Sequence, residues 1–203
     1  SKNFKNKFSL KQINIEGLSD DEKKIIEIEL NDLKNINIFK LSKDKVVDKL
    51  NKFNFLENTY VKKIVPSSLN INLTRTHILG KTFINGEEFY IGKNGKFINS
   101  DQINLRKETP QIFGEFNINE FLNLQKILDN YQLKNLNIQK YFYYKNKRWD
   151  LIFSNGVILK LPSKNYKHSI EIYKKLLINN NLKNIRVIDL RIINQIILTS
   201  NNE

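Results

Sequence analysis

The chain contains no cysteine and only two histidines, His77 and His168, among its 203 residues. Without cysteine no disulfide can hold the fold together. This absence is compatible with a cytosolic or a periplasmic location, because an oxidising compartment permits disulfides without requiring them. The two histidines lie in different predicted domains, and no spaced set of acidic residues accompanies them to complete a metal site or a catalytic triad. We therefore expect a protein that is not an enzyme and needs no metal or cofactor.

The sequence also lacks a long apolar run. No segment approaches the roughly 20 apolar residues that a membrane-spanning helix requires. The start, Ser1 to Lys7, has no apolar core of the kind that a signal peptide carries. We expect the chain as given to be soluble, although its lysine-rich start would equally suit a juxtamembrane segment from which an upstream membrane helix has been removed.

Basic residues are in clear excess, with 34 lysines and arginines against 21 acidic residues and a formal net charge of +13. Clustered positive charge would suggest nucleic-acid binding, because lysine and arginine neutralise phosphates. Here lysine is spread along the whole chain and mixed with acidic residues, as in Asp20-Asp21-Glu22-Lys23-Lys24. Dispersed charge gives no defined footprint, so we do not predict a nucleic-acid partner.

Residues 8–77 show the pattern of a small β-α-α-β-β unit. A short strand that ends at Gly17 precedes Ser19-Asp20-Asp21-Glu22, a capping box in which hydroxyl and carboxylate satisfy free N–H groups at a helix start. Apolar residues at helical spacing predict this helix and a second one that begins after Ser42. A hairpin is predicted next. One of its strands alternates apolar and polar residues, with the apolar positions at Leu69, Ile71 and Leu73.

From residue 78 onward, short strands separated by glycine-containing turns predict a mostly antiparallel β domain with two helices. The helices are expected near 118–131 and 166–177, where apolar residues recur at helical spacing. Between them Trp149 belongs to an alternating strand and should lie in the core. The following Asn155-Gly156 predicts a hairpin with a type I′ turn, which needs positive φ at both of its central residues.

The final apolar segment, Gln195 to Ser200, is predicted to be a strand. A terminal strand often lies at the edge of a sheet, where unpaired N–H and C=O groups can accept a strand from another protein. This favours a docking protein over a catalyst.

The sequence resembles the FtsQ/DivIB family of cell division proteins, and most closely its alphaproteobacterial members, over nearly its whole length. Tyr60 to Ile71 resembles the POTRA hairpin of the family, "V..V.WP..L.I", although Val65 stands in place of the tryptophan. The later part is similar to the family's β domain in the order and spacing of five short segments: Gly95–Ile98, Arg148–Leu151, Asn155–Val157, Leu159–Pro162 and Val187–Arg191.

This resemblance implies an α+β protein with a juxtamembrane remnant at 1–7, a POTRA domain at 8–77 and an FtsQ-type β domain at 78–203. It further implies a single-pass protein of the inner membrane, with the present fragment in the periplasm at the division septum. The implied function is that of a non-enzymatic divisome scaffold, which binds FtsB and FtsL and helps to recruit and regulate septal peptidoglycan synthesis.

The resemblance also implies where the partners bind. In the family the last strand pairs with a strand of FtsB, which carries over to Arg191, Ile192, Asn194, Gln195, Ile196, Ile197, Leu198, Thr199 and Ser200. Lys147 and Arg148 match a second basic position, and Val61 and Lys63 match a POTRA face linked to septal recruitment. Ile192 replaces a family aromatic and Ser200 a tryptophan found in some members, so side-chain contacts should differ while main-chain pairing is retained.

Several alternatives remain open at this stage. Arg191 and Asp189 share one face of a strand, so they could pair with each other instead of with a partner. Lys147 and Arg148 could simply be solvated charges beside a turn, and Val61 could be a buried strand residue. Two other functions compete with the scaffold: a POTRA-containing component of outer-membrane secretion or assembly, and a peptidoglycan-active enzyme.

Overall fold

The computed structural model describes residues 7–105, 108–133, 136–179, 182 and 184–200. The chain forms two compact units, the first made of Ser1–Ile78 with Phe89–Lys107 and the second of Leu79–Glu88 with Glu108–Glu203. The predicted α+β class, with a β-α-α-β-β unit followed by a strand-rich region, is confirmed. Within the described residues, no helix has both the length and the apolar character that crossing a bilayer requires. The predicted juxtamembrane remnant, apart from Lys7, lies outside the described residues.

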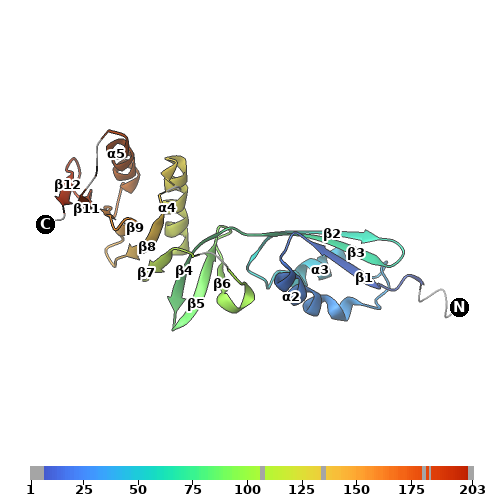
Figure 1. Cartoon of the computed structure of the whole chain (residues 1–203). Helices are drawn as coiled ribbons and strands as arrows, with labels where there is room; N and C mark the ends of the chain where they lie inside the picture. Colours follow the sequence, from blue (N-terminus) through green and yellow to red (C-terminus); the bar gives the residue numbers. More distant parts are fainter. Residues whose placement is uncertain (1–6, 106–107, 134–135, 180–181, 183, 201–203) are drawn as a thin grey trace. The chain divides into compact units, whose positions relative to one another are not determined.

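The first unit is built on a three-stranded sheet with the order β1-β3-β2 (Figure 1). In it β1 (Gln12–Glu16) runs parallel to β3 (Ser68–Arg75), and β2 (Leu56–Ile64) runs antiparallel to β3. Helices α2 (Asp20–Leu30) and α3 (Lys43–Leu50) lie between β1 and β2 in the chain, with a short 3-10 helix η1 (Asn31–Leu33) after α2. This is the predicted β-α-α-β-β order.

Local sequence signals set the ends of these helices. The capping box is present, because Ser19 Oγ accepts from Glu22 N and the Glu22 carboxylate accepts from Ser19 N at 3.0 Å. Ser42 caps α3 by accepting from Lys45 N at 3.1 Å. Leu33, three residues after Leu30, is also buried but belongs to η1 and not to the α-helix.

Residues 89–107 group with the first unit, so the division of the chain differs from a single break after residue 77. The side chain of Asn94 donates to the carbonyl of Asn54 at 2.9 Å, and Asn54 Nδ2 donates to the carbonyl of Phe97 at 2.8 Å. Ile98 and Ile103 are buried in the same core cluster as the residues of α2, α3 and β3. These contacts join the β5–β6 segment to the core of the first unit.

The second sheet has the order β12-β11-β10-β9-β8-β7-β4-β5-β6. Its strands are β4 (Ile78–Ile84), β5 (Glu87–Gly92), β6 (Phe97–Asn99), β7 (Gln111–Phe113), β8 (Ile138–Tyr143), β9 (Trp149–Phe153), β10 (Ile158–Lys160), β11 (Ile185–Asp189) and β12 (Ile197–Ser200). The sheet is mixed: β8, β9 and β10 pair antiparallel in succession, as do β11 and β12, whereas β10 pairs parallel with β11, and β7 pairs parallel with both β4 and β8.

Two helices, α4 (Ile118–Asn130) and α5 (Tyr166–Asn179), bury one face of this sheet in the second unit. Trp149 is 1 % exposed and contacts Phe121 of α4, with ring centroids 5.9 Å apart. Phe153 stacks on Tyr173 of α5 at 5.6 Å. The predicted core position of Trp149 is therefore confirmed, and the side chains on the opposite face of β9 point away from the helices.

The turn that joins β9 to β10 is not the predicted type I′ turn. Of its two central residues only Gly156 has positive φ, at +82°, whereas Asn155 does not. Gly156 N donates to the carbonyl of Phe153 at 2.9 Å, and Phe153 N donates to the carbonyl of Val157 at 3.0 Å. This is a longer connection with glycine at its left-handed position, and the Asn155 side chain stabilises it by accepting from Val157 N.

Candidate partner-binding edge

Strand β12 occupies one edge of the second sheet and, among the described residues, pairs only with β11. It begins at Ile197, two residues later than the start predicted at Gln195. The reason is a turn over residues 192–195, in which Gln195 N donates to the carbonyl of Ile192 and Asn194 adopts a φ of +62°. Gln195 and Ile196 therefore connect this turn to the strand instead of extending it.

The hydrogen-bonding pattern shows which main-chain groups of β12 face outward. Leu190 N donates to the carbonyl of Lys160 in β10, so alternate residues of β11, including Ile188, direct their N–H and C=O groups toward β10. Asp189 must then face β12, where its register partner is Ile197. It follows that Ile197 bonds inward to β11, whereas the N–H and C=O of Leu198 point to the free side.

Exposed aliphatic side chains gather at this edge and in the connection before it. Within seven residues, five large aliphatic side chains are at least 43 % exposed: Ile192, Ile193, Ile196, Ile197 and Leu198. Four of them were predicted as partner-binding residues. Ile193, at 74 %, is the most exposed of the five and was missed, although the apolar run around it in the sequence was a usable signal.

Arg191 and Asp189 pair with each other. Arg191 Nε lies 2.8 and 2.9 Å from the two carboxylate oxygens, Nη2 lies 2.5 Å from Oδ2, and Arg191 N donates to Oδ1 at 3.1 Å. These hydrogen bonds lower the pKa of Asp189. Of the five N–H groups of the guanidinium, those on Nη1 point away from this fork and remain able to bind a second carboxylate.

Asp189 is part of a row of charged residues on the face of the sheet that α4 and α5 leave open. Asp150, Lys160 and Asp189 are direct neighbours across β9, β10 and β11. Arg148 adds a cation at one end, with its Nε 3.5 Å from Asp150, and Arg191 adds one at the other. Burial raises the pKa of Asp150, whereas Arg148 and Lys160 act in the opposite direction. The two predicted basic positions thus lie at opposite ends of one row of alternating charge.

The predicted pair Lys147 and Arg148 divides into two different environments. Lys147 is exposed in a turn with a φ of +65°, and its ammonium group is 4.0 Å from Glu120. Arg148 is only 24 % exposed, and its guanidinium lies 4.2 Å from the centre of the Tyr144 ring. Lys147 is therefore the accessible member, while Arg148 is held by the ring and by Asp150.

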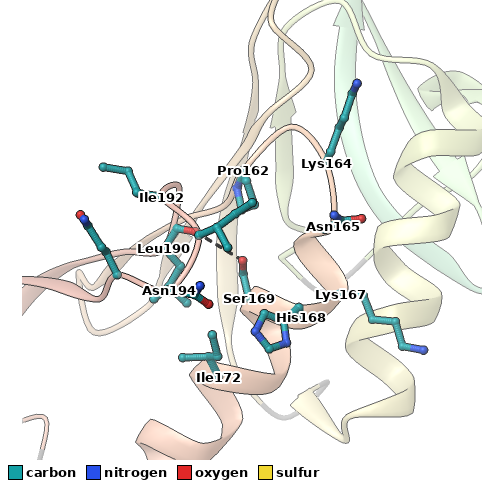
Figure 2. A pocket seen from close by; sticks show the side chains of 12 residues that line it. Pro162, Lys164, Asn165, Lys167, His168, Ser169, Ile172, Leu190, Ile192 and Asn194 are labelled. Atoms are coloured by element: carbon teal, nitrogen blue, oxygen red, sulfur yellow. Dashed lines mark hydrogen bonds between the residues drawn. The ribbon is translucent and has the colours of Figure 1, made fainter.

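A cavity of about 310 Å³ lies between the start of α5 and the connection from β11 to β12 (Figure 2). Pro162, Ile172 and Leu190 give it apolar walls, while Lys164 and His168 contribute polar groups. The Ser169 hydroxyl, drawn with a dashed line, donates to the Leu190 carbonyl at 3.3 Å and so fixes the connection to the helix.

The two POTRA residues predicted as a recruitment face do not both reach the surface. Val61 is 4 % exposed and belongs to the core cluster of the first unit, because it points toward α2 and α3 from the middle of β2. The expectation of a surface role for its side chain is corrected accordingly. Lys63 lies on the same strand and is half-buried.

The described residues contain no group of three or more His, Cys, Asp or Glu side chains placed to hold a metal ion. What the second unit presents instead is a short strand with one free side, flanked by exposed aliphatic side chains and by an arginine. Such an arrangement can add a partner strand through main-chain hydrogen bonds and select it through side chains.

Comparison with known proteins gives two family matches. Residues 83–191 match the model of "Cell division protein FtsQ/DivIB, C-terminal", and residues 8–74 match that of "POTRA domain, FtsQ-type". Strand β12 lies just beyond the first of these matches. The chain is similar to the cell division protein FtsQ of Rickettsia bellii, with 28 % identity over 193 residues that cover 91 % of this chain and 69 % of the relative. FtsQ of Rickettsia prowazekii is also 28 % identical, with the same coverage. The chain belongs to the FtsQ/DivIB family of cell division proteins.

Proposed function

We propose that this chain is a non-enzymatic scaffold of the division machinery, which binds FtsB, and through it FtsL, by adding a strand of FtsB to β12. In this role it works in the periplasm at the septum, held to the inner membrane by an upstream helix, and helps to recruit and regulate septal peptidoglycan synthesis. The single observation that carries the proposal is the free side of β12, with the main-chain groups of Leu198 directed outward.

A partner strand would find both kinds of complementarity at this edge. Main-chain hydrogen bonds to Leu198 need no particular side chain on either protein. A partner residue opposite Leu198 shares the side of the sheet that carries Ile188 and α5, whereas one opposite Ile197 shares the side that carries Asp189 and Arg191. An apolar residue suits the first position and an acidic residue the second.

Arg191 contributes to specificity because it is already positioned. The fork with Asp189 holds the guanidinium beside Ile197, so a partner carboxylate meets an oriented cation and less side-chain entropy is lost on binding. This arrangement combines the two alternatives for Arg191: it pairs within the chain and keeps donors for a partner.

The proposal is tested by measuring the affinity of this chain for the extracytoplasmic part of its cognate FtsB, for example by titration calorimetry. Leu198→Pro removes the outward N–H and places a ring where the partner strand would lie. We expect at least a roughly tenfold loss of affinity, since one hydrogen bond contributes about 1 kcal/mol and the ring adds a steric clash.

Leu198→Ala is the matched control, because it shortens the same side chain while keeping the N–H. It should bind more tightly than Leu198→Pro. An unchanged affinity in a Leu198→Pro variant that is folded by circular dichroism would refute strand addition at β12. Equal losses in the two variants would show that the side chain, and not main-chain pairing, makes the contact.

A further inference from the structure

One end of the first unit, far in sequence from β12, combines exposed apolar side chains with lysines. Because β1 and β3 are parallel neighbours with Gln12 opposite Ser68, the segments before both strands lie at the same end of the sheet (Figure 1). Lys11 N donates to the carbonyl of Ser67 at 2.8 Å, which joins the two segments directly. We call this region the basic end of the first unit: residues 7–11, 34–40 and 63–67.

The third segment belongs to the same end through main-chain hydrogen bonds. Leu10 N donates to the carbonyl of Ile36, and Ile38 N donates to that of Phe8, both at 2.8 Å. The rings of Phe8 and Phe39 lie 5.2 Å apart, yet Phe39 is still 63 % exposed. Val65, in the turn between β2 and β3, is 57 % exposed. Two large apolar tips thus project from one end of the unit.

Lysines surround these tips. Lys7, Lys11, Lys34 and Lys40 are exposed, and Lys63 is half-buried. Of the acidic residues nearby, Asp32 is bound by Lys49 at 2.9 Å, and Asp44 is exposed in the first turn of α3. The basic end therefore carries a marked excess of positive charge. The sequence continues the pattern before residue 7 with Lys2, Phe4 and Lys5.

We propose that the basic end of the first unit is a peripheral contact for an anionic membrane surface, with Phe39 and Val65 entering the interfacial layer and the lysines facing lipid headgroups. Lysine is depleted in protein–protein interfaces, which argues against a protein as the occupant. Aromatic and aliphatic tips among lysines are instead typical of surfaces that bind anionic bilayers. This contact is independent of the strand addition proposed at β12.

The test is cosedimentation of this chain with vesicles. Vesicles that contain phosphatidylglycerol together with phosphatidylcholine should bind the chain, and vesicles of pure phosphatidylcholine should bind it much less. Binding to anionic vesicles should weaken as salt concentration rises, because lysine–headgroup attraction is screened. Equal binding to both kinds of vesicle, or none to the anionic ones, would overturn the proposal.

A double variant addresses the apolar tips. Phe39→Ser with Val65→Ser should reduce partitioning by roughly tenfold or more, since two apolar side chains no longer enter the bilayer interface. The matched control is Phe83→Ser with Ile84→Ser, which changes side chains that are 53 % and 37 % exposed in a hairpin of the other unit. If the control loses as much binding as the test variant, the contact is non-specific and the proposal fails.

A second pair of variants addresses the charge. Lys11→Gln with Lys40→Gln removes two charges from the basic end, while Lys93→Gln with Lys96→Gln removes two exposed charges elsewhere in the same unit. The first pair should weaken vesicle binding by several-fold more than the second. Equal effects of the two pairs would mean that only net charge matters and would refute a defined surface.

Discussion

Two adjacent proline substitutions in β12 should have opposite consequences for its pairing with β11. Ile197 directs its N–H toward Asp189, whereas Leu198 directs its N–H to the free side. Proline lacks the N–H and is tolerated in an edge strand only where that group faces solvent. We therefore expect Ile197→Pro to detach β12 from β11 and Leu198→Pro to leave the pairing intact.

The size of the effect follows from the hydrogen bonds involved. Ile197→Pro removes the bond from its own N–H and displaces the carbonyl that accepts from Asp189. Losing two main-chain bonds of about 1 kcal/mol each corresponds to a roughly thirtyfold rise in local opening. Global stability should change little, because Ile197 and Leu198 are 46 % and 43 % exposed and bury little surface.

Amide hydrogen exchange, followed residue by residue by NMR, measures this directly. The amides of Val187 and Asp189, which face β12, should exchange roughly thirtyfold faster in Ile197→Pro and within about threefold of the wild-type rate in Leu198→Pro. The amide of Ile188, which faces β10, serves as an internal reference in both variants. Equal acceleration by the two prolines would show that the assignment of inward and outward groups is wrong, and the experiment proposed for FtsB binding would lose its basis.

Three further predictions concern other parts of the chain. Arg75→Met should lower the free energy of unfolding by about 2 kcal/mol, because the carboxylate of Glu22, which is 3 % exposed, loses the cation that lies 3.2 Å away. Denaturant unfolding measures this loss, and adding Glu22→Gln in a double variant should restore part of it. Gly17→Ala should destabilise more than Gly156→Ala in thermal melts: both have positive φ, but only at Gly17 would a Cβ meet a backbone atom, the Leu73 carbonyl oxygen at 1.9 Å. Asp189→Asn should cost no more than about 1 kcal/mol at neutral pH, since its partner arginine is partly exposed. Because the pKa of Asp189 is lowered in the folded chain, this stabilisation is present above the unfolded pKa of about 3.9 and is lost as the pH falls through the folded pKa. The stabilities of wild type and variant should therefore converge in acid unfolding.

Much of the fold follows from local sequence signals. The capping box at Ser19 and the cap at Ser42 place two helices because they satisfy backbone groups in a way that is specific to helix starts. Alternating apolar residues place β3 and β9, whose inward side chains are buried. The turn at Asn155-Gly156 was predicted with the wrong type, since an Asn-Gly pair is compatible with more than one loop length and the register of β9 on β10 decides between them.

The candidate site is less visible in the sequence. A terminal apolar segment suggests an edge strand, but the turn around Asn194 that delays β12 depends on a left-handed residue that is not glycine. The row of charges through Asp150, Lys160 and Asp189 arises from the register of three strands, of which β10 and β11 are separated by α5 in the chain. At Val61 the local sequence was the better guide. Its alternation within the strand places it in the core, whereas the resemblance to the family assigned it to a surface.

The order of strands from β7 to β12 follows their order in the chain, so β12 is the last of these six strands to be synthesised. During synthesis the strand proposed to receive a partner is thus the last of the six to emerge. A partner strand that adds to β12 as proposed can therefore bind only after all six strands have been synthesised.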